Sequence, residues 1–203
     1  MARYSSEHKQ ATRQRILERA GRRLKADGID GSGIATLMAD AGLTNGAFYA
    51  HFDSKDDLVA AVVDDQMRTQ REQYAATLAD RAGFEAFVRD YLSPQHRDSP
   101  DEGCPSAALL DEIVRGSAEV KRAYTEGLFA TIDRMAAFIG GPDQEVARAR
   151  ALSIFGGMVG TLQLSRVLAD PQLADEVLAR GVENAILLSE HGGTPSTASS
   201  IAP

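Results

Sequence analysis

Apolar side chains recur at helical spacing along nearly the whole chain, and this periodicity restricts the fold more than any other feature. One face of a helix that starts near Thr12 carries four of them: Ile16, Leu17, Ala20 and Leu24. No run of alternating β-branched residues lies between turn signals, and no segment of roughly 20 to 50 residues repeats. The sequence therefore predicts an all-α fold.

Turn and capping signals divide the first part of the chain into three short helices. Gly28 ends the first helix, and Ser32 stands where it can cap a second one that reaches Gly42. Thr44 can cap a third helix that continues to Phe52. Three short helices joined by tight turns have the size of a small helical DNA-binding module.

Six longer helical segments are predicted in the rest of the chain, about nine helices in all. Ser54 and Pro105 stand at favoured helix starts, whereas residues 93–103 are interrupted by two prolines and are predicted to be a loop. The predicted segments are 55–78, a helix carrying Phe84, Phe87 and Tyr91, 105–114, a helix ending at Ile139, 144–169 and 171–192. We divide the chain into a head (residues 1–54), a helical body (residues 55–192) and a disordered tail (residues 193–203).

Cysteine usage and hydropathy indicate the compartment. Cys104 is the single cysteine, so no disulfide can form within the chain, and no apolar or arginine-rich leader precedes the first helix. The longest apolar run, Ile154 to Leu164, is too short to span a bilayer. We expect a cytoplasmic protein with no membrane partner.

Charge is distributed unevenly between the head and the body. The chain carries a net charge of −7, yet residues 1–26 contain eight Lys or Arg and two acidic residues, so this segment is strongly basic. A basic head on an acidic body suggests that the head meets a polyanion and the body meets something else. A solvated basic helix face is the alternative explanation.

Residues 28–58 carry the most specific motif. A helix, a Gly-containing turn and a second short helix are what a helix-turn-helix requires, because one helix rests on the DNA backbone while the next enters the major groove. The matching residues are Ala41-Gly42, Thr44, Gly46, Phe48-Tyr49, His51-Phe52 and Lys55. This pattern, together with the basic helix before it, resembles the DNA-binding signature of the TetR/AcrR family of bacterial transcriptional regulators.

Several side chains of this segment are suited to DNA. The Asn45 amide can pair with the N6 and N7 atoms of adenine, Gly46 permits close approach, and the methyl group of Ala47 can touch a thymine methyl. Phe48 and Phe52, four residues apart, are expected in the core of the head. The resemblance adds Tyr49 and His51 as contacts to bases or phosphates. The expected DNA-binding set is Ser32, Thr44, Asn45, Gly46, Ala47, Tyr49, His51 and Lys55.

A single helix-turn-helix reads few base pairs, so specific binding to a palindromic operator requires a homodimer. The last two helices carry apolar stripes with small residues between them, which suits an intermolecular four-helix bundle. Packing within one protomer is the alternative. The predicted interface consists of Leu152, Phe155, Gly156, Val159, Gly160, Leu178 and Val182.

The resemblance implies an effector pocket in the middle helices, where aromatic and Met side chains suit an apolar ligand. The expected lining is Met67, Tyr74, Phe87, Tyr91, Cys104, Leu109, Tyr124 and Leu128. Cys104 lies in a Gly-Cys-Pro turn at a helix start, a position that can lower a thiol pKa. In a subset of the family, a cysteine near this point senses electrophiles or oxidants. An inert buried cysteine is the alternative.

The sequence thus predicts a ligand-responsive transcriptional regulator. Repression is the prevailing mode of the family, and the effector is a small molecule, for which an electrophile is one candidate class. No catalytic motif, cofactor-binding loop or metal-ligand spacing is present. The alternative from another class is a helical ligand-binding or redox enzyme that uses Cys104 and retains a vestigial DNA module.

Overall fold

The computed structural model describes residues 2–78 and 80–190, and within these ranges every regular element is helical. The predicted all-α fold is confirmed. The elements are α1 (Ala2–Asp27), α2 (Ile34–Asp40), the 3-10 helix η1 (Asn45–Ala50), α3 (Lys55–Thr77), α4 (Arg81–Tyr91), α5 (Pro94–Asp98), α6 (Pro105–Ile113), α7 (Ala118–Ile139), α8 (Gln144–Val167) and α9 (Pro171–Glu190). None of the described helices is long and apolar enough to cross a bilayer.

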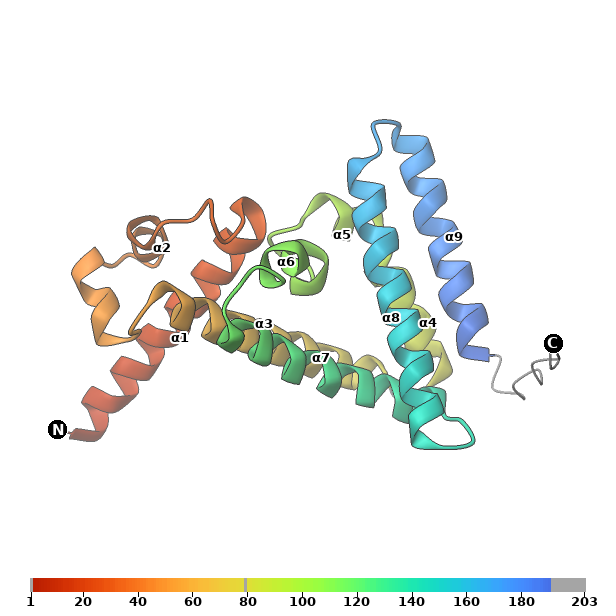
Figure 1. The fold of residues 1–203 in the computed structure, drawn as a ribbon, viewed down its shortest axis with the longest axis horizontal. Helices are drawn as coiled ribbons and strands as arrows, with labels where there is room; N and C mark the ends of the chain where they lie inside the picture. Colours follow the sequence, from red (N-terminus) through yellow and green to blue (C-terminus); the bar gives the residue numbers. More distant parts are fainter. Residues whose placement is uncertain (1, 79, 191–203) are drawn as a thin grey trace, which may run out of the picture.

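The head consists of α1, α2 and η1 at one end of the molecule (Figure 1). Gly28 and Gly42 adopt φ angles of 82° and 70° at the ends of the first two helices, in the left-handed region that favours glycine. The third predicted helix is a 3-10 helix, which is common in segments of so few residues. The prediction that Ser32 caps α2 is wrong, because Gly33 holds the N-cap position and no side chain caps that end.

Helix α3 connects the head to the body. Ser54 caps it as predicted, since its side chain accepts a hydrogen bond from the backbone N–H of Asp57. The first half of α3 packs into the head through buried residues such as Leu58 and Val62. Its second half runs beside α7 toward α8 and α9, so one rigid element enters both halves of the molecule (Figure 1).

The body consists of α4 to α9, and α8 and α9 form an antiparallel pair at the end farthest from the head (Figure 1). Its core contains Phe84, Phe87 and Phe155, together with apolar residues of α7 and α9. The expected loop over residues 93–103 instead contains the short helix α5. Ser93 caps it by accepting a hydrogen bond from His96, and Pro94 occupies its first turn.

The boundary at residue 54 between head and body stays a prediction. The two apolar cores do not follow this boundary. Leu109, Ile113 and Val120, from α6 and α7, belong to the same apolar cluster as the head residues. The predicted tail, residues 193–203, lies outside the described residues, as does the end of the last predicted helix beyond residue 190.

Gly127→Ala should destabilise the protein by roughly 1 to 3 kcal/mol, because an added Cβ at this position of α7 would lie 2.6 Å from the Cβ of Met67 on α3. Main-chain atoms must move to relieve this contact. Chemical denaturation measures the loss. Glu126→Ala, one residue away on the exposed side of α7, should change stability by less than about 0.5 kcal/mol. Equal stability of both variants would contradict the close α3–α7 contact.

Candidate functional site

The recognition segment, residues 44–52, presents one polar face to solvent. Thr44, Asn45 and Gly46 are exposed at its start, and the Tyr49 side chain is 71% exposed. Phe48 and Phe52 are buried on the opposite side with ring centroids 5.7 Å apart, as predicted. Aromatic packing therefore holds the segment in the head while its first turn faces outward.

Arg13 of α1 fixes the far end of this segment. Its Nη1 donates a hydrogen bond to the His51 carbonyl at 2.9 Å, and its guanidinium lies 4.3 Å from the centroid of the Phe52 ring. Sequence reasoning counted Arg13 only as part of the basic helix. No local spacing could have paired residues 38 positions apart.

His51 is partly buried, and its Nδ1 atom has no hydrogen-bond partner. Burial and the neighbouring Lys9 and Arg13 lower the pKa of His51 below its ordinary value. At neutral pH the imidazole is therefore uncharged.

Two residues of the expected DNA-binding set have structural partners instead. Ser32 is 1% exposed, and its hydroxyl donates to the Gly28 carbonyl at 2.8 Å, so we remove it from the candidate contacts. The Lys55 ammonium donates to the Ile29 carbonyl at 2.6 Å and thereby holds the turn between α1 and α2. The exposed cations of α1 at Lys9, Arg15 and Arg19 are better placed to meet phosphates.

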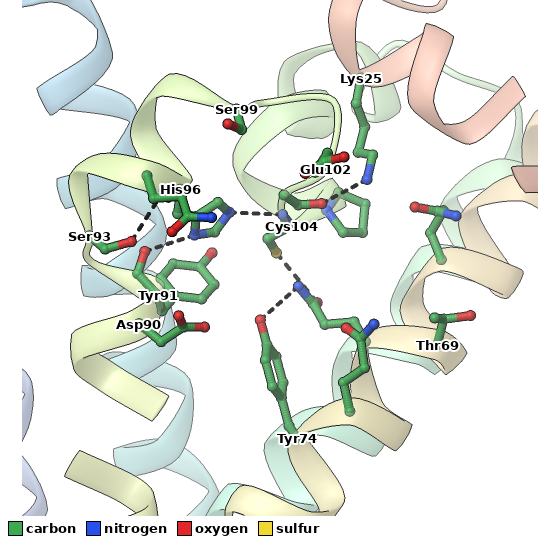
Figure 2. A pocket seen from close by; sticks show the side chains of 16 residues that line it. Lys25, Thr69, Tyr74, Asp90, Tyr91, Ser93, His96, Ser99, Glu102 and Cys104 are labelled. Atoms are coloured by element: carbon green, nitrogen blue, oxygen red, sulfur yellow. Dashed lines mark hydrogen bonds between the residues drawn. The ribbon is translucent and has the colours of Figure 1, made fainter. Parts of the chain in front are cut away.

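A cavity of about 290 Å³ lies where α1, α3, α4 and the α5–α6 segment meet, at the lower end of the range for small-molecule sites. Figure 2 shows its lining side chains. The lining residues are Lys25, Gln66, Thr69, Gln70, Gln73, Tyr74, Asp90, Tyr91, Ser93, Gln95, His96, Ser99, Glu102, Gly103, Cys104 and Pro105.

The cavity contains three of the eight expected ligand-binding residues: Tyr74, Tyr91 and Cys104. The other five do not line it. Met67 and Leu109 are buried in the head cluster and Phe87 in the body cluster, whereas Tyr124 and Leu128 pack against these clusters from partly buried positions. The expectation of an apolar pocket is wrong for this cavity, because most of its lining side chains are amides, hydroxyls or charged groups.

Gln70 organises the floor of the cavity. Its Nε2 donates to the Tyr74 hydroxyl at 3.0 Å, and its Oε1 accepts a hydrogen bond from the Cys104 thiol at 3.4 Å (Figure 2). The neighbouring Tyr91 hydroxyl is buried and has no hydrogen-bond partner. A buried donor without a partner costs free energy, so this hydroxyl differs from its neighbours.

Cys104 is 1% exposed and caps α6 through its backbone. Its backbone N–H donates to the His96 Nε2 at 3.0 Å, while the His96 Nδ1 lies 2.7 Å from the Tyr91 carbonyl. Nε2 acts as an acceptor, so the His96 proton must be on Nδ1 and donate to Tyr91. Burial lowers the pKa of His96, which keeps the ring neutral.

Lys25 is a residue of the head that forms part of the cavity wall. It lies on α1 and is 7% exposed, and its Nζ donates to the Gly103 carbonyl at 2.8 Å. Burial lowers the pKa of Lys25 to about 8. Sequence reasoning assigned Lys25 to the basic DNA-facing helix, and no signal in the sequence separated it from its neighbours.

Glu112 of α6 forms a second link to the head. Its Oε2 accepts hydrogen bonds from the backbone N–H groups of Ile29 and Asp30, in the turn between α1 and α2. The exposed Arg22–Glu102 ion pair adds a third link. The segment from Glu102 to Glu112 therefore contacts both the cavity and the head.

The structure separates the seven expected interface residues into two groups. Leu152, Gly156 and Gly160 lie toward solvent on α8, and a Cβ added at either glycine would meet nothing within 4 Å. The other four residues are buried within the protomer, because α8 packs against α9, α7 and α6: Phe155, Val159, Leu178 and Val182. The alternative of packing within one protomer therefore holds for these four.

Lys25→Met should change the pH dependence of stability. Lys25 has a pKa of about 8 in the fold and 10.5 ordinarily, so the unfolded chain binds more protons between these values and wild-type stability rises with pH there. The unfolding free energy of wild type minus that of the variant should rise by up to about 1.4 kcal/mol per pH unit over this window. The charged or titratable groups that face Lys25 remain in both proteins: Arg22, His96, Asp101, Glu102 and Cys104.

Denaturant unfolding at several pH values between about 7 and 10 provides this measurement. A pH-independent difference between the two proteins would show that Lys25 is not buried as a cation at neutral pH.

The family described as bacterial regulatory proteins, tetR family, matches residues 16–62. The HTH-type transcriptional repressor Rv1474c of Mycobacterium tuberculosis is 33% identical over 141 residues, which cover 66% of this chain and 70% of that protein. The HTH-type transcriptional regulator TtgR of Pseudomonas putida is 39% identical over 64 residues, or 32% of this chain and 30% of TtgR. The TtgR match thus spans less than a third of that protein's length.

Solved structures extend the similarity to the whole fold. The TetR-family regulator SCO4454 of Streptomyces coelicolor is 26% identical with a TM-score of 0.66, over 88% of this chain and 96% of that chain. The reduced form of NemR from E. coli shares the fold with a TM-score of 0.74 at 18% identity, over 92% of this chain and 100% of that chain. Because these relatives are named as regulators, the enzyme alternative is rejected. The chain belongs to the TetR family of bacterial DNA-binding transcriptional regulators.

Proposed function

We propose that this protein is a cytoplasmic repressor that binds a palindromic operator as a homodimer and releases it when a small molecule enters the cavity beside Cys104. The observation that carries this proposal is the shared wall: Lys25 belongs to the head and also lines the cavity. A ligand in the cavity would therefore touch the helix that supports the recognition segment. The name of the M. tuberculosis relative, a transcriptional repressor, favours repression over activation.

We assign base reading to the exposed start of η1. Asn45 is the strongest candidate, because its amide can pair with two atoms of one adenine and nothing in the head covers it. Thr44 and Tyr49 offer hydroxyl groups to phosphates, and Gly46 leaves room for the backbone to approach the bases. Ala47 is half-buried and adds only a methyl contact.

Asn45→Ala should weaken binding to the preferred operator by about 1 to 3 kcal/mol and relax specificity at one base pair of each half-site. Selection of bound sequences from random DNA, followed by affinity measurement at fixed salt, tests both effects. Gln144→Ala removes an exposed amide at the far end of the body and should leave both unchanged. An unaltered selected sequence with Asn45→Ala would remove Asn45 as the base reader.

The dimer surface that we propose is the solvent face of α8. Leu152, Gly156, Gly160, Leu164 and Val167 follow this face at steps of three and four residues. Leu164 and Val167 are 61% and 76% exposed and, with Leu152 at 43%, form an apolar stripe on the outer face of α8. The two open glycines would let a second copy of the helix approach closely.

Leu164→Glu should convert the dimer into monomers at micromolar concentration, because it places a charge in the centre of an apolar interface. Sedimentation or light scattering measures the mass. Val114→Glu is the matched control, since Val114, the C-cap residue of α6, is 64% exposed and lies outside this face. Dimers that persist in Leu164→Glu would place the interface elsewhere.

Three contacts support the proposed coupling between ligand and DNA. The Lys25–Gly103 hydrogen bond and the Arg22–Glu102 ion pair attach α1 to the cavity rim. Glu112 attaches the other end of the same segment to the turn before α2. A ligand that shifts residues 102–112 would therefore move α1 and change the spacing of the two recognition segments, a coupling of roughly 1 to 3 kcal/mol.

An electrophilic effector is the second candidate within this function. The thiol of Cys104 lines the cavity, and its proton is donated to Gln70, so an electrophile that enters would meet the sulfur. Its 1% exposure argues that only a molecule small enough to enter the cavity can react there. Modification of Cys104 would break its hydrogen bond to Gln70 and disturb the same segment.

A further inference from the structure

The cavity holds two buried polar groups whose bonding is incomplete. The Tyr91 hydroxyl lies beside the Cys104 thiol in the wall of the cavity and has no nitrogen or oxygen hydrogen-bond partner, and the residue is only 1% exposed. Its neighbours Tyr74 and Tyr124 differ, because their hydroxyls are paired with Gln70 and Ser106. A buried hydroxyl without a hydrogen-bond acceptor in the wall of a cavity can donate a hydrogen bond to an acceptor atom of a bound ligand.

Lys25 is the second incomplete group. Its ammonium has three N–H donors, and the structure gives it one hydrogen bond, to the Gly103 carbonyl. No carboxylate forms an ion pair with it among the described residues. Asp101 and Glu102 attract this ammonium from beyond ion-pair distance, and a ligand carboxylate in direct contact would offset more of the cost of its burial.

Two acidic residues line the cavity, and Asp90 lies near Tyr74 and His96. Asp90 and Glu102 are both exposed, and Glu102 pairs with Arg22. On the floor, the Gln70 oxygen is already occupied by the Cys104 thiol, and His96 uses both ring nitrogens. Gln70 and His96 are therefore committed to contacts within the protein, whereas Lys25 and Tyr91 can still donate to a ligand.

We propose that the ligand of this cavity is a small organic anion, with a carboxylate that pairs with Lys25 and a second oxygen that accepts a hydrogen bond from the Tyr91 hydroxyl. Figure 2 shows Tyr91 on one side of Cys104 and Lys25 on the other. The inference rests on the proposed function only in taking the cavity as the effector site. It replaces the apolar effector expected from the aromatic residues of the sequence.

The experiment uses the full chain without DNA and three probes: glutarate, adipate and 4-hydroxybenzoate, each compared with its neutral methyl ester. Thermal unfolding and calorimetry report binding. At least one acid should raise the melting temperature and bind at least tenfold more tightly than its ester. If no acid binds, or if the esters bind as well as the acids, the proposal is overturned.

Two variants separate the site from general attraction of anions to the basic head. Tyr91→Phe should keep the melting temperature of the free protein, since the hydroxyl has no partner to lose, and should weaken the acid by about tenfold or more. Lys25→Met should abolish the preference for acid over ester. Tyr124→Phe, whose hydroxyl pairs with Ser106 away from the cavity, should lower stability slightly and leave the acid affinity unchanged. Acid binding that is equal in wild type and Tyr91→Phe would overturn the proposed contact.

Operator release is measured separately with the same probes. Acids that bind through Tyr91 and Lys25 but leave operator affinity unchanged would support the ligand class and refute the coupling to DNA. Release by neutral compounds alone, with no acid bound, would support the coupling and refute the ligand class.

Discussion

The structure depends on one packing constraint: the apolar core of the head is completed by residues of the body. Ile16, Leu24 and Phe48 share a single buried cluster with Leu109 and Ile113 of α6. Because protein interiors are close-packed, α6 cannot shift without repacking the side chains that support the recognition segment. The same helix begins at Cys104, on the floor of the cavity. Packing alone therefore provides a continuous physical path from the cavity to the recognition segment.

Ion pairs and a hydrogen bond also connect α1 to its neighbours. Part of the basic charge of α1 is used within the protein, since Arg22 pairs with Glu102, Arg23 with Asp40, and Lys25 donates to Gly103. Lys9, Arg15 and Arg19 remain exposed along the helix. The cations of the basic head therefore have three uses: Lys9, Arg15 and Arg19 face outward, Arg23 joins α1 to α2, and Arg22 and Lys25 join α1 to the body.

The cavity shows why residue type was a poor guide to which side chains line it. Large apolar side chains gain the most free energy from complete burial, so Met67, Phe87 and Leu109 went into the two cores. The cavity between α1, α3, α4 and the α5–α6 segment is lined instead by polar side chains, whose burial in a core would be costly without hydrogen-bond partners. Tyr91 belongs to both environments, with a ring in the core and a hydroxyl in the cavity.

The sequence by itself determined the helical class, most helix ends and the recognition segment, because periodicity, caps and glycine turns act over only a few residues. Ser54, Pro105 and the Phe48–Phe52 pair were correctly interpreted for this reason. Only the tertiary structure decided which apolar stripe of α8 stays exposed and that Lys25 reaches Gly103, 78 residues away. Such contacts depend on how whole helices pack. The sequence cannot show which of several similar side chains on one helix becomes buried, because burial depends on where the neighbouring helix lies.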